Sequence, residues 1–350
     1  MRSHRQGIIG TILLATIIVS GILVVNYFVD PLQFFRRASY SPALSKEQRF
    51  QNPGIARNYN YDTIILGTSV TENFSTPQIN QKWNCTSVKL AFSGGTLREE
   101  AFMADVALRT GKVKKVLWGV DFTAARGNSD RVRIDSGPFP FYLYDENKIN
   151  DIMYLLNTNT TKQSIKALRN IVDKPSSQTV SLDMLNNWQK EWVFGKESVI
   201  KDYERTISIG RVEEGLNAEC FRENLTTNLI NVIRENPTVE FILFYPPYSM
   251  PFYKTFESTN TIEDWIRTKF WLFNELRSFQ NVKIYDFQND YLISTNLDNY
   301  KDMMHYSEGI NGYMIERISK QEYLIQDPVK YENDLQNFHE KLQGYDPYQI

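Results

Sequence analysis

The chain has 350 residues, of which 42% are hydrophobic and 13% aromatic, so it can bury a large apolar core. This composition excludes disorder of the whole chain. The 39 basic and 41 acidic side chains nearly cancel, so no field of one sign covers the molecule and nucleic acid is not an expected partner. Any charged partner must therefore be recognised locally.

Residues 1–29 are predicted to form a cytoplasmic tip and a transmembrane signal anchor. Residues 7–25 carry only threonine and serine as polar side chains, and the run is long enough to cross the hydrocarbon at about 1.5 Å per residue. No Ala-x-Ala-like cleavage site follows it. Arg2 and Arg5 precede the run, so the positive-inside bias predicts a single-pass protein of the cell membrane with residues 30–350 extracytoplasmic.

The rest of the chain is predicted to divide into a tether, a folded domain and a tail. Residues 30–58 mix Pro, Arg, Gln and Ser without a period, which suits an extracytoplasmic tether. Residues 59–323 alternate strands and helices, although an insertion at 124–220 interrupts the alternation. Insertions of that size usually shape a substrate site or dock a partner. Residues 324–350 are a polar tail to which no chemistry is assigned.

Apolar runs rich in β-branched residues define the fold class. Strands that alternate with helices pair in parallel and are covered on both faces, so we expect a three-layer α/β/α sandwich around a mostly parallel five-stranded sheet. Active sites of such sheets lie at the carboxyl ends of the strands. Thr96 and Glu99 have the spacing of a capping box, and Thr76 with Pro77 suits another helix start. The strands are expected at residues 61–66, 87–92, 113–122, 240–245 and 282–287.

The cysteine pattern predicts no metal centre. Cys85 and Cys220 are the only cysteines, and they could form a disulfide outside the cytoplasm or remain as small buried hydrophobes. No CxxC motif or Cys/His cluster is present, so neither a structural metal nor another cofactor is expected.

Histidine is scarce, which narrows the search for an acid-base group. Only His4, His305 and His339 exist, and His4 precedes the apolar run. His305 follows the fifth expected strand, at the edge of the sheet where sites lie. Asp302 can turn back and accept the Nδ1 proton, so that Nε2 faces a nucleophile. The alternative is a solvated loop histidine beside an aspartate.

Ser69 is the candidate nucleophile, because it follows the first expected strand directly in Gly67-Thr68-Ser69. At that place its hydroxyl can stand above the sheet edge while its own N–H points to a developing oxyanion. The alternative is a turn or capping serine. Thr71 replaces the last glycine of Gly-x-Ser-x-Gly, which disfavours the nucleophile elbow of α/β-hydrolases.

Taken together, these segments resemble the SGNH, or GDSL-type, hydrolase superfamily, in which a serine follows strand one and Asp-x-x-His follows strand five. The resemblance covers about residues 60–320 and implies a flavodoxin-like sheet and a triad of Ser69, Asp302 and His305. The family's Gly-Asp-Ser reads here as Gly67-Thr68-Ser69. The oxyanion glycine of its second block corresponds to Gly94.

The third block departs from the family pattern, because Asp121 stands where the family has an oxyanion-binding asparagine. An ionised carboxylate cannot donate a hydrogen bond to an oxyanion. Asp121 could be protonated, could organise the following loop, or could pair with an arginine of that loop, which is Arg126, Arg131 or Arg133. The backbone N–H groups of Ser69 and Gly94 would remain as oxyanion donors.

The resemblance extends to membrane-anchored bacterial surface-polysaccharide O-acyltransferases and esterases. It implies a surface glycan or polyol acceptor and a membrane-embedded acyl-transfer partner. The aromatic run at 138–144 and Tyr248 could offer faces to sugar rings, although ordinary packing explains such residues too. Similarly, a solvated loop or contact with an anionic polymer would each explain the three arginines, Arg126, Arg131 and Arg133.

The leading hypothesis is therefore a serine esterase or O-acyltransferase that works through an acyl-enzyme at the outer membrane face. The sequence does not decide between water and a sugar hydroxyl as acceptor. The alternative from another class is a non-catalytic SGNH-fold ligand-binding or assembly protein of the cell envelope. A metal-dependent hydrolase lacks ligands, since one histidine near one aspartate is too few.

Overall fold

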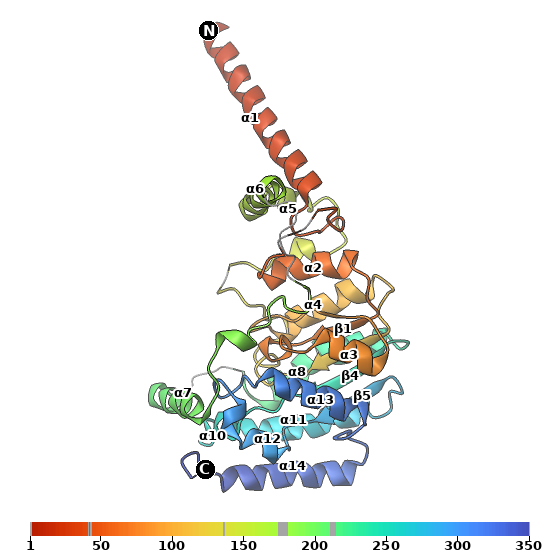
Figure 1. The fold of residues 1–350 in the computed structure, drawn as a ribbon, viewed down its shortest axis with the longest axis vertical. Helices are drawn as coiled ribbons and strands as arrows, with labels where there is room; N and C mark the ends of the chain where they lie inside the picture. The colour runs from red at the N-terminus through yellow and green to blue at the C-terminus, as the bar shows by residue number, and fades with distance from the viewer. Residues whose placement is uncertain are drawn as a thin grey trace. The chain divides into compact units, whose positions relative to one another are not determined.

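A computed structural model describes residues 2–40, 42, 44–135, 137–173, 181–210 and 215–349 of the chain. Contacts between residues divide the chain into two units. Unit 1 is Met1–Tyr59 with Phe139–Ser181, and unit 2 is Asn60–Pro138 with Leu182–Ile350. Unit 1 holds the apolar N-terminal helix α1, and unit 2 holds the sheet and its helices (Figure 1).

Unit 1 is organised around the end of α1 (Arg2–Val29). Within this helix, His4–Val29 is long and apolar enough to cross a membrane. Asp30 follows the helix, and its buried carboxylate accepts hydrogen bonds from the N–H groups of Phe34, Phe35 and Arg36 and from the Tyr154 hydroxyl. This carboxylate therefore fixes the turn that follows α1.

Residues 30–58, predicted to be a tether, contain the helix α2 (Gln48–Asn58). Gln51 on this helix is fully buried, and its Nε2 donates to the carbonyl oxygen of Leu32 over 3.0 Å. The other elements of unit 1 are η2 (Phe141–Leu143), α5 (Ile152–Leu155) and α6 (Thr158–Asp173).

Unit 2 contains a five-stranded sheet of order β2-β1-β3-β4-β5, and every neighbouring pair is parallel. The α/β class and the parallel sheet predicted from sequence are thus confirmed. β1, β3 and β4 are almost entirely buried, as expected of parallel strands covered on both faces. The strands are β1 (Thr63–Leu66), β2 (Ser87–Lys89), β3 (Lys115–Gly119), β4 (Glu240–Tyr245) and β5 (Val282–Asp286).

The strand order creates a switch point between β1 and β3. From β1 the chain moves outward to β2 and then returns to the other side of β1 to form β3. The connections leave the two neighbouring strands in opposite directions, and sheets of this kind usually bind ligands beyond the carboxyl ends at such a point. The segments that follow β1 and β3 meet here, where the Thr68 hydroxyl next to Ser69 donates to Asp121.

The helices of unit 2 form two groups by their mutual contacts. α3 (Thr76–Trp83) contacts α13 (Glu308–Ser319). The second group includes α4 (Leu97–Leu108), α8 (Ala218–Leu225), η4 (Thr226–Ile230), α9 (Asn231–Glu235), α11 (Thr261–Leu276) and α14 (Pro328–Gln343). Shorter elements follow strands β4 and β5, namely α10 (Met250–Lys254), α12 (Tyr291–Ser294) and η5 (Leu297–Asn299).

Two predicted helix starts have different outcomes. The capping box at α4 is confirmed, since Thr96 accepts from the Glu99 N–H and the Glu99 carboxylate accepts from the Thr96 N–H. For α3 the cap is Ser75 and not Thr76, because the Ser75 side chain accepts from the N–H of Gln78. The predicted cap, Thr76 before Pro77, is thus one position from the observed cap at Ser75.

The C-terminal tail adds a helix to unit 2. α14 buries Tyr331, Leu335 and Phe338 against its neighbours. The Tyr331 hydroxyl donates to Asp286 at the end of β5 over 3.1 Å, and Lys269 of α11 forms an ion pair with the same carboxylate at 2.5 Å. The two charged side chains are only 1% and 4% exposed. The pair therefore joins α11, β5 and α14 in a water-poor interior.

Replacing Lys269 with methionine is expected to lower the free energy of unfolding by about 3–5 kcal/mol, because it leaves the Asp286 carboxylate buried without its cation. The double variant Lys269→Met/Asp286→Asn removes both charges and should recover much of this loss. Urea unfolding followed by tryptophan fluorescence measures both variants. A double variant that is no more stable than Lys269→Met would contradict the pairing.

Candidate active site

A glycine-dependent turn presents Ser69 beyond the end of β1. Gly67 has a φ of +137°, a conformation that side chains rarely adopt, and a Cβ there would lie 2.6 Å from Cγ2 of Thr71. Ser69 then opens the short 3₁₀ turn η1 (Ser69–Thr71). The strand ends abruptly for this reason, and the Ser69 side chain stays partly exposed at the rim of the sheet.

His305 and Asp302 lie in a tight loop between η5 and α13. Tyr300 and Tyr306 pair as an antiparallel bridge, and the Lys301 N–H donates to the His305 carbonyl oxygen over 3.0 Å. Both tyrosines are buried. The loop is also held from the segment after β4, where the Ser249 hydroxyl donates to the Met303 carbonyl oxygen over 2.7 Å. The position of the imidazole is thus fixed from both sides.

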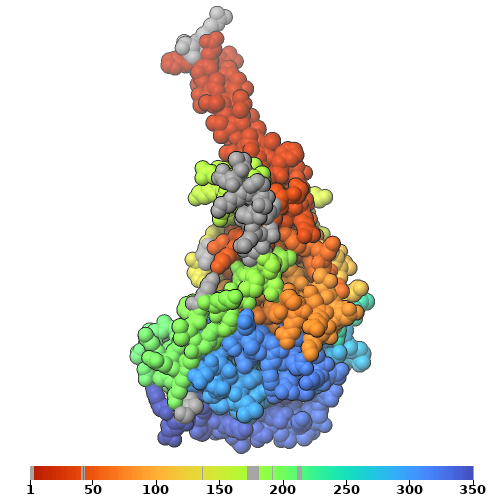
Figure 2. All heavy atoms as spheres, in the orientation of Figure 1, coloured from red at the N-terminus to blue at the C-terminus, as the bar shows by residue number. Residues whose placement is uncertain are grey.

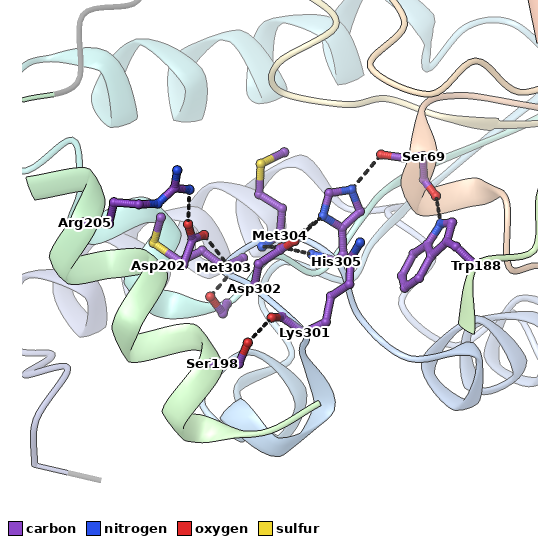
Figure 3. Close-up of polar contacts among 11 residues, drawn as sticks. Ser69, Trp188, Ser198, Asp202, Arg205, Lys301, Asp302, Met303, Met304 and His305 are labelled. Atoms are coloured by element: carbon purple, nitrogen blue, oxygen red, sulfur yellow. Dashed lines mark hydrogen bonds and ion pairs between the residues drawn. The ribbon is translucent and has the colours of Figure 1, made fainter. Parts of the chain in front are cut away.

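The three predicted catalytic side chains form a continuous hydrogen-bonded chain (Figure 3). Ser69 Oγ lies 2.7 Å from His305 Nε2, although the residues are 236 positions apart. His305 Nδ1 lies 2.9 and 2.8 Å from the two Asp302 oxygens. Because a carboxylate only accepts, Nδ1 donates, and the neutral ring then offers its Nε2 lone pair to the serine hydroxyl.

Asp302 is held in its ionised form. Burial by itself raises the pKa of this carboxyl, but hydrogen bonds from the imidazole and from the N–H groups of His305 and Met304 outweigh it and lower the pKa below its ordinary value. The side chains of His305 and Asp302 are 22% and 30% exposed. The pair is therefore sheltered yet remains within reach of solvent and substrate.

Two backbone N–H groups are available as oxyanion donors. The Phe92 N–H donates to the Gly67 carbonyl oxygen over 3.0 Å, so the chains after β1 and β2 stay paired up to this point. Ser69 and Gly94 each follow two residues later. Within the described part of the chain, neither of their N–H groups has an acceptor. Gly94 has a φ of +55°, and a Cβ there would lie 2.3 Å from Nη1 of Arg133.

Asp121 organises the loop after β3. Its Oδ1 accepts from the N–H and hydroxyl of Thr123, at 2.7 and 2.8 Å, and its Oδ2 accepts from the Thr68 hydroxyl at 2.5 Å. Both oxygens are acceptors in these contacts, which favours the loop-ordering interpretation over an oxyanion donor. The Thr68 bond joins the segments after β1 and β3 at the residue that precedes Ser69.

Three of the remaining predicted site residues, Arg131, Arg133 and Tyr248, have contacts within the protein. Arg131 donates to the carbonyl oxygens of Thr123 and Ala124, and Arg133 pairs with Asp135 at 2.5 Å. Arg126 is partly exposed in the same loop. Tyr248, predicted to offer a face to a sugar ring, is instead fully buried and packs edge-on to Phe252. Its ring has no surface left for a ligand in this conformation.

Sequence reasoning missed Trp188, which touches two members of the triad. Its Nε1–H donates to the Ser69 carbonyl oxygen over 3.0 Å, and its ring meets the His305 imidazole edge to face at 5.4 Å (Figure 3). The Lys301 ammonium lies 4.4 Å from the centre of the same indole ring. No local motif marks this tryptophan, because its partners are distant in sequence.

The insertion segment that carries Trp188 is tied to the sheet by the partly buried Lys89. Lys89 of β2 donates to the carbonyl oxygens of Glu72 and Asp183, both at 2.6 Å. The Asp183 carboxylate in turn accepts from the N–H and hydroxyl of Thr76. Trp188 follows five residues later, and its N–H donates to the Asn73 side chain over 3.1 Å. These bonds set the indole against Ser69.

A second part of the insertion, α7 (Lys196–Ile209), supports the Asp302 loop from outside. Ser198 donates to the Lys301 carbonyl oxygen over 2.5 Å, and Asp202 accepts from the Met303 N–H over 3.3 Å (Figure 3). Beside these hydrogen bonds, a cavity of about 650 Å³ lies between α7 and the loop. It is lined by Trp192, Ser198, Lys201, Asp202, Arg205, Thr206, Ile209, Gly210, Phe252 and residues 301–305, and so opens beside Asp302 and His305.

Cys85 and Cys220 are both free thiols, so the disulfide considered from sequence is not formed. Among the residues that the structure describes, no group of three or more His, Cys, Asp or Glu side chains is arranged to hold a metal ion.

Comparison with known proteins does not classify the chain. It matches no protein-family model, and no curated protein matches its sequence. The geometry of the site is therefore the basis for its chemistry.

Lys89 provides a pH test of how the insertion is held. Burial lowers the pKa of its ammonium to about 8, although Asp183, Glu72 and Glu308 act in the opposite direction. In the unfolded chain lysine titrates at about 10.4, so between these values the unfolded chain binds more protons and stability rises with pH.

The stability of the wild type relative to Lys89→Met is thus expected to increase from about pH 8 to about pH 10. Urea unfolding at several pH values measures this difference. Tyrosine ionisation affects both proteins and cancels. A difference that stays flat or falls over this range would show that Lys89 is not buried as described.

Proposed function

We propose that this chain is a membrane-anchored serine esterase or O-acyltransferase of the SGNH type. The observation that carries the proposal is the chain of hydrogen bonds from Ser69 Oγ through His305 to Asp302. A serine paired with a base that a carboxylate orients is the arrangement that activates a hydroxyl for acyl transfer.

The proposed reaction begins when Ser69 Oγ attacks an ester carbonyl carbon and gives its proton to His305 Nε2. Asp302 stabilises the imidazolium that forms. The N–H groups of Ser69 and Gly94 stabilise the oxyanion. Nε2 then protonates the leaving alcohol, and the acyl group remains on the serine. In the second half, Nε2 takes a proton from the incoming hydroxyl as that hydroxyl attacks the acyl-enzyme, and the proton returns to Oγ when the ester of Ser69 breaks.

The acceptor decides whether the enzyme is a hydrolase or a transferase. Water gives an esterase, and a hydroxyl of a surface glycan or polyol gives an O-acyltransferase. The apolar span at His4–Val29 supports a position at the membrane, where we place residues 30–350 on the extracytoplasmic side beside a membrane-embedded acyl-transfer partner. This setting favours acyl esters of cell-surface polysaccharide as substrates.

The SGNH-type proposal includes a three-layer α/β/α sandwich of the flavodoxin-like kind. The strand order β2-β1-β3-β4-β5 supports it. So do the two groups of helices, one built on α3 and α13 and the other on α4, α8, α11 and α14, because a parallel sheet with two buried faces needs helices on each.

One observation favours a second candidate, a non-catalytic ligand-binding or assembly protein of the cell envelope. Asp121, at the place of the third oxyanion donor, accepts hydrogen bonds and orders its loop. Loss of one such donor typically lowers a rate by about 10²–10³. An intact triad with two backbone donors retains the means for acyl chemistry, so the enzyme remains the first proposal.

Ser69→Ala tests the proposal. The wild type is expected to react with a fluorophosphonate and to hydrolyse an activated acetyl ester, whereas Ser69→Ala should lose labelling and about 10⁴-fold or more of the turnover. Labelling is read by mass spectrometry of the modified peptide.

Ser319→Ala, which removes an exposed serine on α13, is the matched control and should behave like the wild type. Equal labelling and turnover in wild type and Ser69→Ala would refute the mechanism and leave the non-catalytic protein as the better assignment.

Trp188→Phe tests whether the indole positions the nucleophile. The change keeps an aromatic ring beside His305 but removes the N–H that holds the Ser69 carbonyl, so the rate of fluorophosphonate labelling should fall roughly fivefold for the loss of about 1 kcal/mol. Trp83→Phe is the control, because it also removes an indole hydrogen bond, here to Ser319. If both variants slow labelling alike, the indole of Trp188 has no specific role.

A further inference from the structure

Helix α6 in unit 1 has three distinct faces. Thr160, Ser164 and Ala167 are buried at helical spacing, and their small side chains allow close packing where α6 contacts α1. The other two faces are exposed, one of them apolar and the other basic.

The apolar face consists of Ile165, Leu168 and Ile171, which are 45%, 43% and 42% exposed. On a helix these residues lie three apart, so the stripe winds slowly around α6 and ends at Ile171, one turn beyond the buried Ala167. Each of the three keeps about two fifths of its surface open to solvent. The contacting helix α5 and its flanks add further exposed apolar side chains, namely Ile149, Ile152, Met153 and Leu156.

The basic face consists of Lys162, Lys166 and Arg169, all of them exposed. None of the three forms an ion pair with an acidic side chain in the part of the chain that the structure describes. The cations are therefore available to an anionic partner next to the apolar stripe.

The position of α6 along α1 identifies the partner. Asn26, in the last turn of α1, is fully buried and donates to the Thr161 hydroxyl and the Leu155 carbonyl oxygen at 2.8 and 2.7 Å. Tyr27 and Phe28 next to it are 43% and 70% exposed. Exposed aromatic residues at the end of an apolar span sit at the level of the lipid headgroups. In Figures 1 and 2, α6 (yellow-green) lies beside this end of α1 (red).

We infer that α6 lies in the headgroup region of the bilayer that α1 spans, with Ile165, Leu168 and Ile171 in contact with acyl chains and Lys162, Lys166 and Arg169 on anionic headgroups. An amphipathic helix with apolar and basic faces is the kind of element that binds such an interface. The inference rests on the anchoring role of α1 and not on the chemistry of Ser69.

Fluorescence quenching in vesicles tests this placement with the full chain. Leu168→Cys is made in a Cys85→Ser/Cys220→Ser background, labelled with the environment-sensitive dye NBD, and reconstituted in phosphatidylcholine and phosphatidylglycerol that include an acyl-chain nitroxide lipid. We expect the nitroxide to remove most of the fluorescence at position 168. Neutralising Lys162, Lys166 and Arg169 to glutamine should make the quenching insensitive to phosphatidylglycerol.

Two further labelling sites make the result decisive. Leu292→Cys, 86% exposed in unit 2, is the matched control and should not be quenched. Val19→Cys reports on α1 alone. Quenching at 19 but not at 168 would overturn the inference and leave the anchor intact. If the emission at 168 is also blue-shifted in that case, the face is covered by protein and not by lipid. Absence of quenching at both positions would refute anchor and inference together. Ser69→Ala should leave all these signals unchanged.

Discussion

The hydrogen bond between Ser69 Oγ and His305 Nε2 forms because the parallel sheet brings together two residues that are 236 positions apart in the chain. Strand β1 and the loop after β5 both deliver their side chains at the carboxyl edge, and only a common strand direction makes these edges coincide. Gly67 then stops β1, and the paired Tyr300 and Tyr306 close the opposite loop. The site is thus held by rigid elements on both sides, as acyl chemistry requires.

The insertion contributes positioning to the site. Trp188 bonds the Ser69 backbone and packs on the His305 ring, while α7 holds the backbone of the Asp302 loop. Lys89 donates to two carbonyl oxygens, and its desolvation between the segments lowers the pKa of its ammonium to about 8. The segment that departs from the simple βα alternation therefore contacts Ser69 and His305 and lines the cavity beside Asp302 and His305.

Asp121 links the loops that follow β1 and β3. Its carboxylate takes the hydroxyl of Thr68 and orders Thr123, so the loops after β1 and β3 are linked directly before the nucleophile. In the proposed reaction, the N–H groups of Ser69 and Gly94, which have no acceptor in the described residues, would stabilise the oxyanion. In unit 1, the buried Asp30 carboxylate has a comparable structural task, because it fixes the turn by which the chain leaves α1.

The sequence alone determined what depends on neighbours along the chain. Buried β-branched runs predicted the parallel strands, Thr96 and Glu99 predicted the start of α4, and residue type and order selected Ser69, Asp302 and His305. Only the tertiary structure showed the strand order, the contact of Trp188 with Ser69, the burial of Tyr248 and the docking of α14. These features depend on packing between segments far apart in the chain, and no local period or motif encodes which distant surface a side chain will meet.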